Sequence, residues 1–398
     1  MAQINATSAG RPRVSIPAGI LLTCLVVLLA QPALALTPIA QFRENRADAN
    51  GDYLWSYSEN WMWANTGTIS GLPRLAGQVE VGDDHSGPVE CVMDVPFAQT
   101  YGCEIAEGYA MGRTAGSKIT IRQGSTWECY APFQVGKDDK GFLDVEGTLK
   151  IKTSMYSMSN FYVGDFGHSN ARGTVYVGST GTIQSNGEVY ILGIRTKNYQ
   201  RGSDDSIPPE RDYGSSVTVD GGTFLFSKQL KLYSGIASCP GTLRLKGNAT
   251  LTQESGSNAL NAIGGGVLEI DGGSANIHVR RMTFQGGRDH YGAYNPAVLK
   301  LTGNGISTIY NSGSTTLGYR SILDVSELHV APGTYTVING ASINAGGLSF
   351  ASGIDLNDWS FSTGSGDLLL TYDPAPEPAG LALLCIGGVT LLRRRRRA

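Results

Sequence analysis

The sequence predicts an all-β protein, a right-handed parallel β-helix (β-solenoid) in which successive coils stack on one another. A four-residue pattern of apolar, polar, apolar and then polar or Gly residues returns seven times between residues 119 and 302. Gly makes up 53 of the 398 residues, about twice its usual frequency, and charged residues make up only 16%, against about a quarter in most domains. Because Gly adopts the positive φ that tight corners require, this composition fits a coiled sheet with many corners.

Each repeat of the pattern is typical of a β-strand with one buried face, since the side chains of a strand alternate between its two faces. The starts of successive repeats lie 24, 32, 42, 26, 25 and 31 residues apart, which is the spacing of stacked architectures. The seven repeats are residues 119–122, 143–146, 175–178, 217–220, 243–246, 268–271 and 299–302.

If these repeats are neighbouring strands of one parallel sheet, their outward residues form columns along the stack. Opposite charges then become neighbours, and each such pair stabilises the sheet by about 0.2–1 kcal/mol. A slip of one residue would bury the charges, so this pattern predicts a definite register. The two columns of alternating charge are Arg244, Glu269, Lys300 and Asp220, Lys246, Asp271.

A second short strand follows the first within each repeat and ends in several cases in Val-Gly or a relative of it. Examples are residues 133–136, 161–164, 189–193 and 282–286. We therefore expect two strands per coil, joined by corners that contain Ser-Thr-Trp or Gly-Gly-Thr. Over residues 116–302 this arrangement resembles the repeats of autotransporter passengers and of PEP-CTERM proteins, which implies a secreted parallel β-helix.

Tryptophans mark the expected cap at the N-terminal end. Trp55, Trp61 and Trp63 suit this role, because an uncovered solenoid end exposes an unpaired strand edge and an apolar interior. The same three side chains could instead form a platform on which sugars stack. At the other end, Trp359 and Phe361 are expected to cover the last coil.

The first 35 residues have the features of a secretory signal peptide. A polar start with Arg11 and Arg13 precedes an apolar run at 20–30 and the small-residue sequence Ala33-Leu34-Ala35, so cleavage is expected after Ala35. The alternative, a membrane anchor, would need an apolar run of about 20 residues.

A second sorting feature lies at the other end of the sequence. Pro376, Glu377 and Pro378 lead into an uncharged segment at 379–392, which is followed by an arginine cluster. This order closely resembles the PEP-CTERM sorting signal of Gram-negative bacteria. The alternative is an ordinary tail anchor, although the segment reaches only about 21 Å against a hydrocarbon core of about 30 Å. The cluster consists of Arg393, Arg394, Arg395, Arg396 and Arg397.

The resemblance implies a route and a partner. A membrane-embedded exosortase would recognise the signal, cleave near Pro-Glu-Pro and release the protein from the inner membrane to the cell surface or the exopolysaccharide matrix. The predicted organisation is a signal peptide at 1–35, a cap and first coils at 36–115, β-helix repeats at 116–320, terminal coils and a closing strand at 321–372, a linker at 373–378, and the sorting signal at 376–398 with a transmembrane segment at 379–392.

Four cysteines lie between the two terminal segments, an even count that suggests disulfides in an oxidising compartment. Cys91 and Cys103 bracket eleven residues, short enough for a local bridge, and Cys129 and Cys239 remain. Three connectivities are possible for four cysteines.

Two polar segments interrupt the repeats and are expected to leave the stack as loops, at 195–214 and 286–296. Both follow the second predicted strand of their repeat, so both should emerge at the same corner. The second segment combines aromatic and charged residues, which could stack on sugars and bond their hydroxyls, or could simply form a solvated surface. The candidate glycan-binding residues are Arg288, Asp289, His290, Tyr291 and Tyr294.

Charge and motifs restrict the possible functions. Residues 36–378 contain 24 basic and 34 acidic residues, a net charge of −10, which argues against a nucleic-acid partner. Two carboxylate pairs, Asp144 with Glu146 and Glu269 with Asp271, could serve an enzyme, but they also fit the charge columns. No metal-ligand or cofactor motif is present, so neither a metal nor a cofactor is expected.

The sequence therefore favours an exported structural or adhesive protein of the cell surface or exopolysaccharide matrix, with extracellular polysaccharide as a possible partner. The alternative is an extracellular polysaccharide lyase or hydrolase on the same scaffold. A cluster of two or more carboxylates with a Lys or Arg would favour the enzyme, whereas an unbroken charged column would favour the structural function.

Overall fold

A computed structural model describes the part of the chain that begins at Ile39. The predicted signal peptide and the sorting signal with its transmembrane segment lie outside the described residues. Within the part that is described, no helix is long and apolar enough to cross a bilayer. The described residues are 39–64, 72–73, 77–82, 89–106, 116–153, 159–165, 171–193, 214–234, 239–255, 259–288, 294–364 and 366–374.

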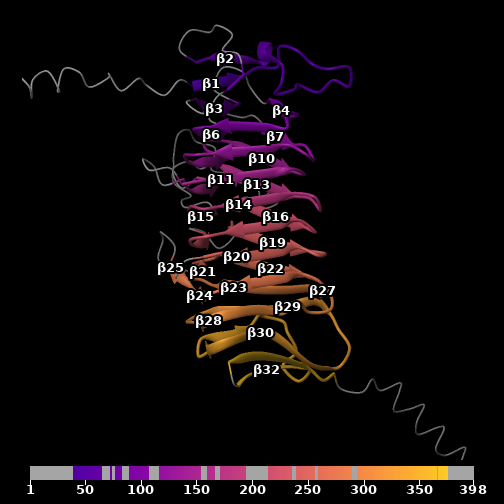
Figure 1. The fold of residues 1–398 in the computed structure, drawn as a ribbon. Helices are drawn as coiled ribbons and strands as arrows, with labels where there is room; N and C mark the ends of the chain where they lie inside the picture. Colours follow the sequence, from indigo (N-terminus) through magenta and orange to yellow (C-terminus); the bar gives the residue numbers. More distant parts are fainter. Residues whose placement is uncertain are drawn as a thin grey trace, which may run out of the picture. The chain divides into compact units, whose positions relative to one another are not determined.

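These residues form a parallel β-solenoid of about eight turns, as the sequence predicts (Figure 1). Each complete coil contains three strands. First strands pair in parallel with the first strands of neighbouring coils, and second and third strands pair in the same way. The first strands make a ten-stranded sheet, here called the first-strand wall. Its members are β4 (Glu90–Met93), β7 (Ser117–Ile121), β10 (Lys140–Val145), β13 (Arg172–Val177), β16 (Ser216–Asp220), β19 (Thr242–Lys246), β22 (Val267–Asp271), β27 (Ala297–Asn304), β29 (Ser321–His329) and β31 (Leu348–Phe350).

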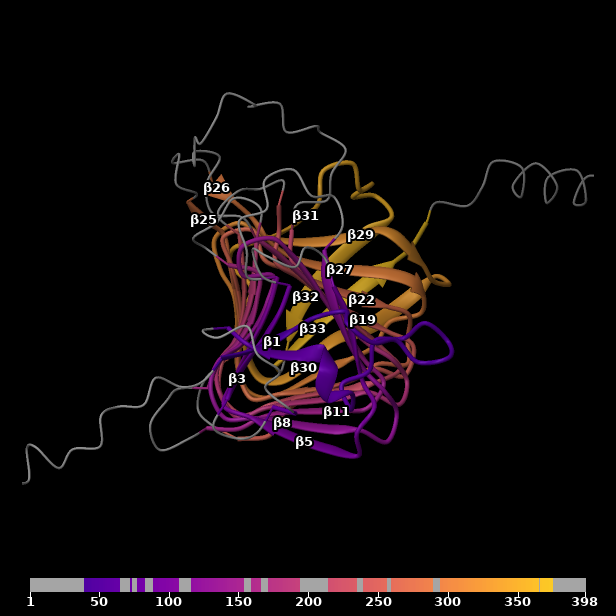
Figure 2. The same ribbon diagram turned by 90° about the horizontal axis from the view of Figure 1, so that it is seen from above.

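The other two walls belong to a second sheet, and Figure 2 shows the stacked strands from above. In the last coils the longer strands β28 (Ile309–Leu317) and β30 (Gly333–Asn344) continue this sheet. The second strands are β5 (Phe97–Thr100), β8 (Thr126–Cys129), β11 (Thr148–Ile151), β14 (Thr182–Ser185), β17 (Thr223–Phe226), β20 (Thr250–Gln253) and β23 (Asn276–Val279). The third strands are β3 (Gln78–Val81), β6 (Gly102–Ile105), β9 (Phe133–Val135), β12 (Phe161–Val163), β15 (Val189–Leu192), β18 (Leu230–Tyr233), β21 (Leu260–Ile263) and β24 (Met282–Gln285).

The prediction of two strands per coil was wrong, because the strands predicted as second are the third. The missed strands are only four residues long and begin directly after a corner, usually with Thr. Their alternation is therefore too short to separate them from the corner sequence around them. In β11, for example, Leu149 and Ile151 face the core while Thr148 and Lys150 face outward.

The predicted register of the first-strand wall is confirmed. Arg244 pairs with Glu269, and Glu269 pairs with Lys300 on the next coil. The second column pairs in the same way, from Asp220 to Lys246 to Asp271. The leucines and isoleucines between these positions are buried, including Leu245, Ile270 and Leu301.

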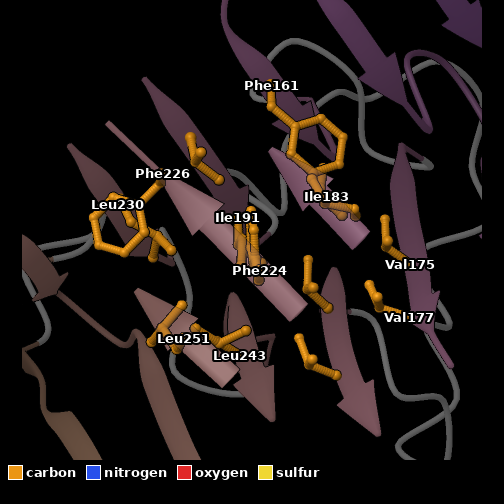
Figure 3. Close-up of a cluster of buried hydrophobic side chains, with 14 of the residues drawn as sticks. Phe161, Val175, Val177, Ile183, Ile191, Phe224, Phe226, Leu230, Leu243 and Leu251 are labelled. Carbon is orange, nitrogen blue, oxygen red and sulfur yellow. The ribbon is translucent and has the colours of Figure 1, made fainter. Parts of the chain in front are cut away.

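The interior is a continuous column of apolar side chains, part of which Figure 3 shows around Phe161, Ile191 and Phe224. Aromatic rings run along it from coil to coil in edge contacts. The ring of Phe161 lies 5.9 Å from that of Phe133 and 6.4 Å from that of Phe224. Close packing along the axis therefore joins each coil to its neighbours.

Gly at the corners lets successive coils approach closely. Gly136 has a φ of +75°, and a Cβ added there would lie 1.9 Å from the carbonyl oxygen of Arg172 on the next coil. No side chain fits at that distance, so Gly is required both for the turn and for the stacking.

Antiparallel strands cover both ends of the stack. At the N-terminal end, β1 (Ile39–Phe42) pairs with β2 (Trp61–Trp63), after the short 3-10 helix η1 (Ser58–Asn60). At the other end, β33 (Asp367–Tyr372) pairs with β30 and with β32 (Trp359–Gly364). The closing strand is confirmed, and Trp359 and Phe361 pack against the core.

The tryptophans of the N-terminal region lie where a cap requires them. Trp55 and Trp61 are 1% and 0% exposed, and their ring centroids are 4.6 Å apart. Buried rings cannot stack on a sugar, so these two residues belong to the cap. Trp63 is partly buried against the same core.

The structure corrects the disulfide prediction, because Cys91 and Cys103 are free thiols. Cys91 lies on β4 of the first-strand wall and Cys103 on β6 of the other sheet, with the complete strand β5 between them. The intervening residues therefore travel around the coil and do not close a local loop. Burial raises the pKa of both thiols well above the ordinary value, which keeps them unreactive.

Candidate functional site

The predicted glycan-binding segment leaves the coil as a small hairpin between β24 and β27. Its strands β25 (Gly287–Arg288) and β26 (Tyr294–Asn295) are antiparallel, and Arg288 lies directly opposite Tyr294. Of the predicted site residues, Asp289, His290 and Tyr291 lie outside the described residues.

The other predicted loop, at 195–214, is outside the described residues except for Gly214. It connects β15 to β16, whereas the hairpin connects β24 to β27. Both segments therefore join the third strand of one coil to the first strand of the next, which agrees with the prediction of a common corner.

The hairpin brings Arg288 and Tyr294 together with two residues that the sequence reasoning did not single out, Tyr319 and Arg320. We call these four residues the corner cluster. The guanidinium carbons of Arg288 and Arg320 lie 4.4 and 4.6 Å from the centroid of the Tyr294 ring. Tyr319 presents its ring to Tyr294 edge to face, with centroids 5.7 Å apart. Two cations therefore lie against one aromatic ring, an attractive arrangement for each of them.

Backbone contacts hold the two parts of the corner cluster in place. Tyr319 and Arg320 form the turn between β28 and β29, on the coil after the hairpin. The amide N–H of Gly286 donates to the carbonyl oxygen of Tyr319 at 2.8 Å, and that of Ala297 donates to the carbonyl oxygen of Arg320 at 3.3 Å. A Cβ on Gly286 would lie 2.8 Å from the Cβ of Arg320, so Gly permits this close approach.

Arg320 occupies a backbone conformation that usually belongs to Gly. Its φ is +56°, in the left-handed region, which costs a residue with a Cβ about 1–2 kcal/mol. Local sterics would favour Gly or Asn at this position. Arg at a strained position therefore draws attention to its side chain.

Cations of the first-strand wall form ion pairs with carboxylates, whereas those of the corner cluster contact aromatic rings. Among the described residues, neither Arg288 nor Arg320 forms an ion pair, and both side chains are exposed. Tyr319 is also exposed, at 58%. The corner cluster therefore offers two guanidinium groups and an aromatic ring to solvent.

On the first-strand wall, two of the four carboxylates considered as catalytic groups, Asp144 and Glu269, are paired with cations of neighbouring coils. Asp144 accepts from the ammonium group of Lys118 at 2.7 Å, and Glu269 accepts from Arg244 at 2.9 Å. Burial alone would lower the pKa of Lys118, but its hydrogen bonds and its attraction to Asp144 and Glu90 together outweigh burial and raise it. These carboxylates therefore contribute to the sheet as members of ion pairs.

A further polar group lies on the outward side of the second strands, around the carboxylate of Glu128. It accepts from Lys152, Gln99 and the hydroxyl of Tyr130, at 2.6, 3.0 and 2.9 Å. Burial acts to raise the pKa of Glu128, but these three hydrogen bonds prevail and lower it to about 2. The carboxylate thus stays ionised and fully bonded, which is a structural arrangement.

The third strands carry a similar group on their outward side. The Tyr190 ring stacks on the Tyr162 ring, with centroids 5.0 Å apart, and the ammonium group of Lys231 lies 4.6 Å from the centroid of the Tyr190 ring. The hydroxyl of Tyr190 donates to Glu188, which also accepts from Lys231 at 3.3 Å. Burial and this carboxylate raise the pKa of Tyr190, which makes it a poor general base. Neighbouring coils cover the ring face, so a sugar has no flat surface to stack on.

One regular surface feature follows from the strands that the sequence reasoning missed. The first outward position of the second strands is threonine in five successive coils, and these residues pair in register. Neighbouring β-branched side chains of this kind stabilise a sheet. The threonines are Thr126, Thr148, Thr182, Thr223 and Thr250.

A surface pocket near the N-terminal cap is lined by apolar side chains, including Leu72 and Phe97, and by Gln99. The described residues that line it include no titratable group. Within the described ranges, no group of three His, Cys, Asp or Glu residues could hold a metal ion.

Comparisons with known proteins found no match to a family model, to a curated protein or to a solved structure.

Proposed function

We propose that this protein is an exported structural or adhesive component of the cell surface or exopolysaccharide matrix. A stack of coils with a continuous apolar interior and covered ends supports a scaffold function. We expect the coil to be right-handed, because crossovers between parallel strands take that hand in about 98% of cases.

The observation that carries the adhesive part of this proposal is the corner cluster. Its aromatic rings and cations lie at an exposed corner, whereas the ionic groups of the walls bond one another. Tyr rings stack on the apolar faces of sugars, and guanidinium groups donate to their oxygens. Extracellular polysaccharide is therefore the partner that fits this corner best.

The proposed route to the surface is a signal peptide at 1–35 followed by exosortase-dependent processing of the sorting signal at 376–398. The resemblance of Pro376-Glu377-Pro378, the apolar segment and the arginine cluster to PEP-CTERM signals supports this route. The precursor would be held in the inner membrane only until it is cleaved.

A catalytic function on the same scaffold, as a polysaccharide lyase or hydrolase, has weaker support. Asp144 and Glu269 bond cations of neighbouring coils, and the hydroxyl of Tyr190 bonds a carboxylate. These contacts explain the residues without a reaction.

Fractionation of the native cells tests the proposed function. The protein should be found at the surface or in the medium with a C-terminus near residues 376–378, as measured by mass spectrometry. Replacing all five residues of the arginine cluster by Ser should leave an uncleaved precursor in the inner membrane. Unchanged release of that variant would contradict exosortase sorting. As a control, Arg281→Ser removes an exposed arginine of the solenoid and should be released normally.

A further inference from the structure

We propose that the corner cluster binds the carboxylate groups of an acidic, uronate-containing polysaccharide. This inference rests on the proposed function and specifies the class of polysaccharide that the protein binds.

Among the described residues, no anion balances the charge of the two guanidinium groups. Arg288 and Arg320 lie 4.4 and 4.6 Å from the same ring centroid, so their guanidinium carbons are at most 9.0 Å apart. This upper bound is close to the screening length of about 8 Å at physiological salt, so salt screens the repulsion between the two cations only in part. The Tyr294 ring attracts each cation but carries no net charge. An anion close to both would remove the repulsion, and no described residue supplies one.

The shape of the guanidinium groups also suits a carboxylate ligand. A guanidinium group is a planar fork of N–H donors that matches the two oxygens of a carboxylate. Contact with Tyr294 restrains both arginine side chains, so less conformational entropy is lost when an anion binds. The ring of Tyr319 is exposed and makes an edge-to-face contact with that of Tyr294. A sugar ring could lie on Tyr319 while its carboxylate reaches the arginines.

We expect the ligand to be a polymer. The arginines are exposed, so a single carboxylate would bind weakly in competition with water. A polymer with one carboxylate per sugar presents many copies to the same corner and raises their effective concentration. The net charge of −10 over residues 36–378 disfavours such a polymer elsewhere on the protein. Binding should therefore depend on the corner cluster.

Affinity electrophoresis of the exported protein through gels containing polygalacturonate tests this inference. Methyl-esterified polygalacturonate is the matched control, because it keeps the sugar and removes the charge. Dextran sulfate separates a carboxylate site from a site for sulfate. The variants are Arg288→Gln and Arg320→Gln, and Arg281→Gln is the control because it removes an exposed arginine at a different corner of the same coil. Unchanged circular dichroism and melting temperature would show that each variant folds.

We expect the wild type and Arg281→Gln to be retarded by polygalacturonate and not by its methyl ester. Each corner variant should lose about tenfold to a hundredfold in affinity, the usual effect of losing a charge-assisted hydrogen bond. Equal retardation by the ester, a preference for dextran sulfate, or corner variants that behave like Arg281→Gln would each overturn the inference. So would the absence of any retardation. A surface location and binding to the polysaccharide of the native cells would still support the proposed function in that case.

Discussion

The first-strand wall and the corner cluster contain the same kinds of charged residues, but these residues have different functions in the two places. On the wall, Glu269 lies between Arg244 and Lys300, so each charge has an opposite neighbour one coil away. At the corner, Arg288 and Arg320 meet the faces of tyrosine rings. The difference shows that the function of a charge in this fold is set by the residue stacked above or below it. Charges of the wall stabilise the coil, and those of the corner remain available to a partner.

The largest expected effect on stability comes from replacing an aromatic residue of the interior, which can be compared with replacing one of the corner cluster. Phe161 is completely buried, so Phe161→Ala should lower the free energy of unfolding by about 3–5 kcal/mol. Tyr294 is partly exposed, and Tyr294→Ala should cost only about 1 kcal/mol, from lost cation–π contacts. Guanidinium denaturation measures both values. Equal losses would mean that the hairpin is as important for stability as the core.

The next test concerns Glu128 on the second strands, whose pKa of about 2 lies below the ordinary value of 4.5. A group with a depressed pKa in the folded state stabilises that state above its unfolded pKa and loses this contribution as the pH falls. Between pH 4.5 and 2, protonation of Glu128 should therefore remove about 2 kcal/mol of stability.

The variant Glu128→Gln should be less stable than the wild type at neutral pH and should show a flatter acid dependence over the same range. Urea denaturation at several pH values measures this difference. An identical acid dependence of the variant would contradict the assignment to Glu128. Glu254→Gln is the control, since Glu254 is an exposed carboxylate that directly follows β20 of the same sheet.

The smallest expected effect is on the first-strand wall itself. Glu269→Gln removes the carboxylate between Arg244 and Lys300 and leaves two cations in adjacent coils, so we expect a loss of about 1 kcal/mol. The loss should shrink in high salt, because salt screens the remaining repulsion. Thermal unfolding at low and high salt measures both effects. Asp271→Asn, in the second column of alternating charge, is the control and should change stability less. A loss that does not respond to salt would mean that packing, and not charge, is the contribution of Glu269.

Several parts of the fold could be read from the sequence because they depend on neighbours along one strand. In residues 243–246, Leu243 and Leu245 alternate with Arg244 and Lys246, and only one register buries the leucines. The terminal coils and the closing strand follow from the same alternation. The second strands could not be recognised, because four residues such as Thr148–Ile151 are too few to distinguish a strand from a corner.

The candidate site also contains residues that could be predicted from the sequence and residues that could not. Arg288 and Tyr294 could be singled out because they lie in one polar segment that interrupts the repeats. Tyr319 and Arg320 follow 25 and 26 residues after Tyr294, in a turn without any unusual composition. Only the stacking of that turn on the preceding coil places them at the hairpin. In the same way, Cys91 and Cys103 are close in sequence, but the coil separates them onto different sheets.

The sequence by itself thus determined which face of each first strand is buried and where the coils end. Both depend on short-range features, because the alternation of apolar and polar residues and the glycines of the corners each involve only a few consecutive residues. Tertiary structure decided the number of strands per coil, the free state of Cys91 and Cys103, and the partners of each exposed charge. The physical reason is that a parallel solenoid makes its contacts between residues about one coil apart. A corner of variable length changes that spacing, so the residue that meets Arg288 or Tyr294 is known only once the coils are stacked.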